Sequence, residues 1–298
     1  MISFLKLIRY KNLLMVFITL VLTKYALIHS FISPSFLTDY QFIILLFSII
    51  FITASGYIIN DIFDLKADKI NKPNKVYIKK TISKNSAWKS YFLMVLIGVF
   101  LGVYLSFSVN KIEYSFTFIG TAIGLFLYSK YLKKLPLIGN VFVAILIGLS
   151  IFILYLFDIK KINTSDNLSL ERTVCIYIIF SFLTTLIREI IKDIEDIDGD
   201  YLQKMKTLPI VIGRNRTRNI ILTITLFTFV FTVVITRFLF ENYKLFFWYS
   251  IIFISCPLIY FLMKLRNAKS KKEYHLLSNL MKIIMLFGIL SMTLFQFI

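Results

Sequence analysis

Acidic residues are scarce in this chain, with 16 Asp and Glu against 34 Lys and Arg among 298 residues. There are only two cysteines, Cys175 and Cys256, and they lie far apart in apolar segments, so neither a disulfide framework nor a zinc site is expected. The chain also has no glycine-rich phosphate loop and no Gly-x-Ser-x-Gly turn. These absences exclude the common nucleotide-binding and serine-hydrolase sites.

Apolar residues, in contrast, are abundant. They make up 58% of the chain, which includes 31 Phe and has a mean hydropathy of +0.79, values typical of a protein that lies mostly in lipid. Nine apolar stretches are long enough to cross a hydrocarbon layer of roughly 30 Å. They are apolar on every face, which favours helices over a β-barrel. The stretches run near residues 12–33, 39–59, 88–109, 113–129, 136–157, 173–191, 217–238, 244–263 and 277–297.

Basic residues are distributed unevenly over the short loops, and this distribution predicts the orientation of the chain. Lys6, Arg9 and Lys11 precede the first apolar stretch, and further basic clusters follow the second, fourth, sixth and eighth stretches. We therefore expect an integral, multi-pass protein of a bacterial or archaeal cytoplasmic membrane, with its N-terminus inside. Attraction to anionic lipid accounts for the net charge of +18, and nucleic acid is not an expected partner.

The few acidic residues are concentrated in two segments, 60–68 and 193–200, and each segment adjoins the end of an apolar stretch. In the first segment Asn60, Asp64 and Asp68 recur every four positions. A continuing helix places such residues on one face, which here presents an amide oxygen and two carboxylates.

The second acidic segment repeats this spacing in Asp196 and Asp200, with Asp193 three residues earlier. Carboxylates held close together raise one another's pKa unless a cation neutralises them. Mg²⁺ prefers oxygen ligands and is typically shared between one or two carboxylates and substrate phosphates. Ordinary solvated loop charges are the alternative, but two matching clusters in an acid-poor chain favour a Mg²⁺ site for a polyphosphate. The basic residues expected to bind the same anion are Lys72, Lys75, Arg188, Lys192, Lys204 and Lys206.

Three stretches of the sequence resemble the UbiA superfamily of intramembrane prenyltransferases. The first Asp-rich motif of that family resembles NDIFDLKADKINKP, and the second resembles REIIKDIEDIDGDYLQKMKTLPIVIG. The family's connection between spans four and five resembles YSKYLKKLPLIGNVFVA. The resemblance covers essentially the whole chain. It implies an all-α fold, with nine transmembrane helices around a central cavity that opens to the cytoplasmic side, in a single domain over residues 1–298.

The resemblance also implies the reaction, which is Mg²⁺-dependent transfer of a polyprenyl group from an allylic prenyl diphosphate to a lipophilic acceptor. The expected partners are therefore the prenyl diphosphate donor, the acceptor and membrane lipid, and the sequence does not indicate an oligomeric state. By motif position, the expected metal ligands are Asn60, Asp64, Asp68, Asp196 and Asp200, with Asp61 and Asp193 supporting and with the four ligating aspartates as the catalytic residues.

Further residues are expected to contact the substrates. Ser129 and Asn140 are polar enough to orient an acceptor, although helix packing explains them as well. Lys72 and Lys75 stand where many family members carry arginine, so the charge is kept and the bidentate geometry is lost. Tyr57, Phe63 and Tyr128 are the aromatic residues expected near a developing carbocation.

Both acidic motifs are most similar to those of geranylgeranylglycerol-phosphate geranylgeranyltransferases and of chlorophyll synthase-like members. This similarity favours a lipid hydroxyl as the acceptor. The alternatives are an aromatic quinone precursor or a haem or chlorophyll-like acceptor. A cation-coupled secondary transporter is the alternative from another class, but its carboxylates are expected at the middle of the membrane rather than at span ends.

Overall fold

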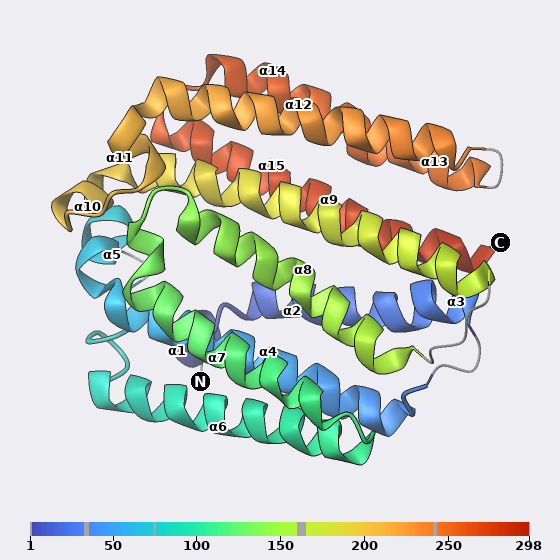
Figure 1. Cartoon of the computed structure of the whole chain (residues 1–298). Coiled ribbons are helices and arrows are strands. Elements are labelled where there is room, and N and C mark those ends of the chain that lie inside the picture. Colours follow the sequence, from blue (N-terminus) through green and yellow to red (C-terminus); the bar gives the residue numbers. More distant parts are fainter. Residues whose placement is uncertain (1, 33–35, 74–75, 160–164, 241–242, 298) are drawn as a thin grey trace. The chain divides into compact units, whose positions relative to one another are not determined.

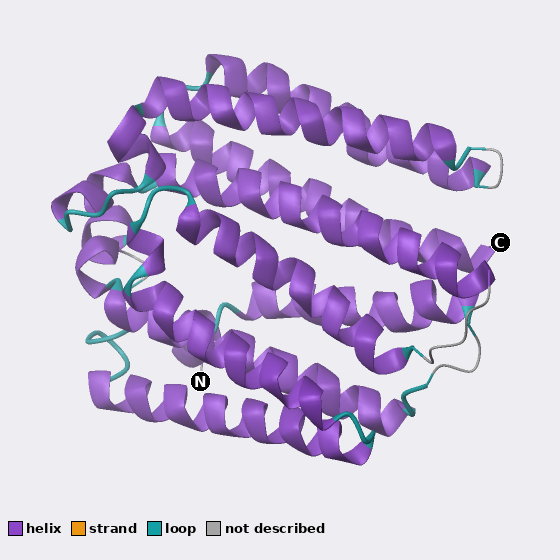
Figure 2. Cartoon of the chain, in the orientation of Figure 1, coloured by secondary structure: helices purple, strands orange, loops and turns teal. Residues whose placement is uncertain are grey.

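The computed structural model describes residues 2–32, 36–73, 76–159, 165–240 and 243–297. These residues form helices joined by short loops, and no strand occurs among them apart from one isolated bridge between Ile78 and Ile82 (Figure 2). The prediction of an all-α membrane protein is confirmed.

Eight helical segments within the described residues are long and apolar enough to cross a membrane. The remaining predicted stretch, 113–129, corresponds to α7 (Ser115–Lys130), whose 16 residues rise only about 24 Å. The chain is a multi-pass integral membrane protein, while nine spans, a cytoplasmic opening and a cytoplasmic N-terminus stay predictions. The eight segments are Tyr10–Phe31, Asp39–Phe63, Lys84–Ser108, Ile138–Asp158, Leu168–Glu195, Arg214–Phe238, Lys244–Asn267 and Lys271–Phe297.

The chain forms two compact units. The first unit contains Met1–Leu20, Phe36–Leu135 and Asp198–Met205, so it includes the whole first acidic segment and the end of the second. The second unit contains the remaining residues, including Asp193 and Asp196. A single domain over residues 1–298 stays a prediction.

Three long helices of the first unit lie side by side: α4 (Asp39–Phe63), α6 (Lys84–Ser108) and α7 (Figure 1). Two glycines of α6 permit this close packing. A Cβ at Gly98 would lie 2.7 Å from Ile52 of α4, and a Cβ at Gly102 would lie 2.3 Å from the Phe118 ring of α7. Small residues let membrane helices approach closely. Such close packing matters in lipid, which provides no hydrophobic force between helices.

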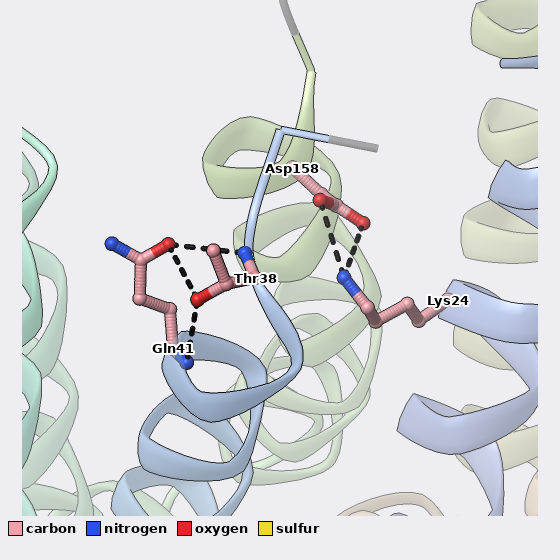
Figure 3. Close-up of polar contacts among 4 residues, drawn as sticks. All are labelled: Lys24, Thr38, Gln41 and Asp158. Carbon is pink, nitrogen blue, oxygen red and sulfur yellow. Dashed lines mark hydrogen bonds and ion pairs between the residues drawn. The ribbon is translucent and has the colours of Figure 1, made fainter. Parts of the chain in front are cut away.

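A capping box starts α4. The side chain of Thr38 accepts a hydrogen bond from the Gln41 backbone N–H, and the Gln41 side chain accepts one from the Thr38 N–H at 3.0 Å (Figure 3). This reciprocal arrangement satisfies donors at the helix terminus that no intrahelical carbonyl can reach. The other elements of the unit are α1 (Ile2–Leu7), most of α2 (Tyr10–Leu22), α5 (Leu65–Asn71), η3 (Ile112–Tyr114), η4 (Leu132–Lys134) and α10 (Ile197–Leu202).

The second unit is centred on α9 (Ser165–Glu195), which contacts α8 (Ile138–Asp158), α12 (Arg214–Phe238) and α15 (Lys271–Leu290). Its core includes three fully buried isoleucines of α9 and apolar side chains of α14 and α15. Two shorter helices, α3 (His29–Phe31) and α11 (Leu208–Ile212), belong to this unit. So do α13 (Lys244–Ser250), the π-helical η5 (Ile251–Ser255), α14 (Cys256–Asn267) and η6 (Ser291–Phe297).

One face of α12 is lined with buried threonines. Each hydroxyl donates to a backbone carbonyl four residues earlier in the chain, at 2.7–2.9 Å, so no partner from another helix is required. A threonine side chain can make this bond because its hydroxyl reaches back over the preceding helical turn. The threonines are Thr217, Thr225, Thr228, Thr232 and Thr236.

The first membrane segment contains a π-helical turn, η1 (Thr23–Ile28). Within it, Lys24 is fully buried and its Nζ lies 3.5 and 3.4 Å from the two carboxylate oxygens of Asp158, the last residue of α8 (Figure 3). The Asp158 side chain is also fully buried. An ion pair of this kind is retained only with close geometry, because both charges have lost their water.

Candidate active site

The first acidic segment crosses a break between two helices. α4 ends at Phe63 and α5 begins at Leu65, with Asp64 between them at φ −87° and ψ 2°. The helical hydrogen bonds continue through the break, from the Asp64 N–H to the Asn60 carbonyl and from the Asp68 N–H to the Asp64 carbonyl, both at 2.9 Å. The four-residue register of Asn60, Asp64 and Asp68 is therefore preserved, as the spacing predicted.

A lysine from another element lies on this acidic face. Lys133 of η4 contacts Asp64 Oδ1, and its Nζ lies 3.2 Å from Asn60 Oδ1. Burial lowers the pKa of Lys133, and the neighbouring Asp64 carboxylate opposes this change. The ammonium group thus binds the same two oxygens that the spacing predicts as metal ligands.

Asp61 points to a different cation. Arg9, which connects α1 to α2 with a positive φ of 52°, donates from Nη2 to Asp61 Oδ1 at 2.9 Å. The guanidinium also lies over the Tyr57 ring, 4.9 Å from its centroid. Tyr57 therefore already faces a cation of the protein itself. Phe63 packs edge-on against Trp88 and Phe126, which assigns it a packing role.

Asp68 lies among charges of both signs. Burial raises the pKa of Asp68 to about 6, and the carboxylates of Asp64 and Asp61 raise it further, while Lys72 and Arg9 oppose them. A cation bound beside Asp68 would favour its ionised form.

The donor chemistry of this face fits Mg²⁺. All of the predicted ligands offer oxygen atoms, and a cation, the Lys133 ammonium, already lies between two of them. Among the described residues no three or more His, Cys, Asp or Glu side chains gather into a set that could hold one metal ion by themselves. Mg²⁺ commonly takes only one or two carboxylates and fills its remaining positions with water and phosphate oxygens, so the fit holds.

The second acidic segment begins at the end of α9. Asp193 accepts a hydrogen bond at 2.9 Å from Asn140 Nδ2, in the first turn of α8. Asp196 lies between α9 and α10, with its N–H donating to the Lys192 carbonyl. Glu195 pairs with His275 Nδ1 at 2.9 Å. The hydrogen bond to Asp193 gives Asn140 a role in helix packing. Contact of Asn140 with substrate stays a prediction.

The predicted basic residues near the second segment have an acidic partner. Arg188 and Lys192 both bind Glu189 Oε1, at 2.9 and 2.5 Å. They therefore form a small charged group on the last turns of α9. Whether this group also binds a substrate anion stays a prediction.

The remaining predicted residues lie in different surroundings. Lys72 is the residue directly after α5, and its N–H donates to the Asp68 carbonyl. Lys204 follows α10 and has a positive φ of 55°. Tyr128 and Ser129 lie in the last turns of α7. Ser129 is fully buried and, within the described part of the chain, its Oγ has no hydrogen-bond partner. Lys75 falls outside the described residues.

The model of the UbiA prenyltransferase family matches residues 14–286. The chain belongs to the UbiA prenyltransferase family. The resemblance seen in the acidic motifs is thereby confirmed.

Curated relatives in this family are named digeranylgeranylglyceryl phosphate synthase. The one from Saccharolobus solfataricus is 40% identical over 168 residues, which cover 56% of this chain and 55% of the relative. The chain thus aligns with little more than half the length of that relative. The one from Methanosarcina mazei is 34% identical over 72% of each chain, and the one from Methanosphaera stadtmanae is 29% identical over 97% of each chain.

Solved structures share the fold. One, from a study of digeranylgeranylglyceryl phosphate synthase in membranes, has a TM-score of 0.65 and 25% identity and covers 98% of both chains. A UbiA homologue from Aeropyrum pernix has a TM-score of 0.67 with 17% identity, over 93% of this chain and 98% of its own. A UbiA homologue from Archaeoglobus fulgidus, solved with GPP and Mg²⁺, has a TM-score of 0.64 with 12% identity, over 98% of this chain and 99% of its own.

Proposed function

We propose that this UbiA family member transfers a geranylgeranyl group from geranylgeranyl diphosphate to a hydroxyl of a glycerol-phosphate lipid, in a Mg²⁺-dependent reaction. The observation that carries the proposal is the cation-binding face of the first acidic segment, where Lys133 lies between Asn60 and Asp64. The choice of acceptor is supported by the relative from Methanosphaera stadtmanae, which aligns over nearly the whole chain and is named digeranylgeranylglyceryl phosphate synthase.

The residues proposed to hold Mg²⁺ offer only oxygen ligands, and the solved Archaeoglobus fulgidus homologue with GPP and Mg²⁺ supports the choice of metal and donor. When bound, Mg²⁺ would neutralise the diphosphate and stabilise its charge as the allylic C–O bond breaks. The proposed ligands are Asn60, Asp64, Asp68, Asp196 and Asp200, with Asp61 and Asp193 supporting.

The chain's own cations have distinct proposed roles. Lys133 neutralises Asp64 before substrate arrives, and its ammonium can then donate to a diphosphate oxygen as a charge-assisted hydrogen bond. Arg9 keeps Asp61 oriented toward itself, which leaves Asp64 and Asp68 as the carboxylates directed to the cation. Lys72, one residue beyond α5, provides positive charge next to Asp68.

The whole chain acts as a single domain in a cytoplasmic membrane, with the N-terminus inside and the acidic segments on the cytoplasmic side. The allylic chain and the lipid acceptor are both apolar, and a membrane protein can receive them from the bilayer itself.

The test is a reaction with the purified full chain in detergent, Mg²⁺ and labelled geranylgeranyl diphosphate. Separate reactions contain geranylgeranylglyceryl phosphate, an aromatic quinone precursor, or a chlorophyll-like or haem acceptor. The proposal requires a Mg²⁺-dependent ether product with geranylgeranylglyceryl phosphate only. Transfer to one of the other acceptors would show that the proposed acceptor is wrong. Absence of transfer to every acceptor would refute the proposed function.

A further inference from the structure

A hydrogen bond within the first unit links the end of the first acidic motif to the second acidic segment. The backbone N–H of Gly199, in α10, donates at 2.9 Å to Oδ1 of Asn71, the last residue of α5, and both residues are buried. Asn71 lies three residues after Asp68, and Gly199 lies between Asp198 and Asp200. The bond therefore connects points that are 128 residues apart in sequence and adjacent to acidic residues on both sides.

The contact depends on both residue types. The Gly199 N–H is in the first turn of α10, where backbone donors have no carbonyl partner within the helix, and the Asn71 side chain supplies the acceptor. A Cβ at position 199 would lie 2.4 Å from Nδ2 and 2.6 Å from Cγ of Asn71. Any larger residue at position 199 must therefore displace the amide that holds it.

Both residues lie within the two acidic motifs, but neither is among the proposed metal ligands. Asn71 stands in the DKINKP end of the first motif, and Gly199 stands in the DGD of the second. Neither offers a ligand to the cation: the Asn71 oxygen is engaged by the Gly199 N–H, and Gly199 has no side chain. Their contribution must come through the position of their acidic neighbours.

We propose that Asn71 is a positioning residue, whose side-chain oxygen holds Gly199 and thereby fixes the register of the Asp68 turn against the Asp198–Asp200 turn. The proposal deepens the proposed function, because it assigns a role at the same metal–diphosphate site. Without the bond the two acidic turns lose their common register. Mg²⁺ binding must then also order the two turns, which weakens the apparent affinity. A higher Mg²⁺ concentration is therefore required for the same occupancy.

The experiment measures Mg²⁺-dependent binding of geranyl S-thiolodiphosphate, a prenyl diphosphate analogue that resists ionisation, to the purified full chain. Asn71→Leu removes the acceptor at nearly constant volume, Asn71→Asp keeps an acceptor oxygen, and the exposed Asn85→Ala is the matched control. Asn71→Leu should raise the half-saturating Mg²⁺ concentration about tenfold, the equivalent of about 1.4 kcal/mol and of one hydrogen bond. Asn71→Asp and Asn85→Ala should not raise it.

A second comparison tests whether Gly199 acts through Asn71. Gly199→Ala should raise the Mg²⁺ requirement because its Cβ displaces the Asn71 amide. In the double variant Asn71→Ala/Gly199→Ala that clash is gone, so its requirement should match that of Asn71→Ala alone. Additive effects of the two changes would overturn the proposed contact.

Three further outcomes bear on this inference and on the proposed function. If Asn71→Leu reduces only the fraction of protein that binds, with the half-saturating Mg²⁺ concentration unchanged, Asn71 is merely structural and the inference is wrong. If the wild-type chain binds the analogue with Mg²⁺ and yet transfers no prenyl group, the proposed function fails while the binding data still decide the role of Asn71. A wild-type chain that binds no analogue with Mg²⁺ would overturn the inference as well.

Discussion

Removing one partner of the buried Lys24–Asp158 pair should destabilise the protein strongly. Lys24→Met and Asp158→Leu each leave an ionised group buried without its counter-ion. At the observed separation of 3.4 Å, with an effective dielectric constant of about 20, the attraction between the two charges is about 5 kcal/mol. Truncating one side of buried pairs costs about 3–5 kcal/mol, which agrees with this value. We expect either single variant to lose that amount.

The double variant Lys24→Met/Asp158→Leu should behave differently. It removes both charges together and replaces them by apolar groups, a change that is often neutral or stabilising by about 1–4 kcal/mol. The expected result is therefore two damaging single changes whose combination is close to wild type. The exposed Lys89→Met serves as a control for loss of a lysine as such.

The assay measures the midpoint of thermal unfolding in detergent, from the fraction of protein that stays monodisperse after heating. At roughly 2–3 °C per kcal/mol for a chain of this size, each single variant should lower the midpoint by about 6–15 °C. Single variants as stable as Lys89→Met, or a double variant as damaged as the sum of the singles, would refute the argument that the two charges stabilise each other.

Four further predictions concern the acidic face and the helix packing of the first unit. Asp64→Ala should abolish Mg²⁺-dependent prenyl transfer in the acceptor assay with the protein still folded, and the exposed Glu113→Ala should retain activity; equal activities would contradict the metal site. Lys133→Met should lower transfer rate and weaken donor binding together, because it removes a cation next to Asp64, whereas a change in neither would exclude Lys133 from the site. Because burial raises the pKa of Asp68 to about 6, protons compete with the metal for this carboxylate below that pH. The half-saturating Mg²⁺ concentration should therefore rise by up to about tenfold for each pH unit below about 6 and stay constant above about 7. A half-saturating concentration that does not change with pH would show that Asp68 is not a ligand. Gly102→Leu should unfold the first unit or prevent its assembly because the Phe118 ring occupies the space of its Cβ, and a normal elution profile and thermal midpoint would contradict this packing.

Local spacing was enough to predict that three residues of the first acidic segment lie in one helical register. Asn60, Asp64 and Asp68 share a helical face because the four-residue hydrogen bonds continue across the break at Asp64. The apolar stretches predicted helices because a backbone in lipid must satisfy its hydrogen bonds internally. The predicted stretch 113–129 is the shortest of the nine, and α7 is shorter still because Ile112–Tyr114 form a separate short helix before Ser115.

Contacts between distant segments could not be predicted in this way. Lys133 resembled its neighbours Lys130 and Lys134 as ordinary positive charge beside a span, and only the fold selects it for Asp64. Lys24 is one basic residue in an apolar stretch, and nothing local connects it with Asp158, which is 134 residues away. Such pairs are determined by helix packing and therefore required the structure.

The threonine face of α12 has a consequence for how the helix enters the bilayer during synthesis. A free hydroxyl in hydrocarbon is costly, but the hydroxyls of Thr225, Thr228, Thr232 and Thr236 have their acceptors within α12 itself. The cost is thus met before any neighbouring helix is present. α12 can insert as an independent segment and associate with α9 afterwards, and its effective hydrophobicity at insertion exceeds the value that a residue-by-residue sum over its threonines would assign.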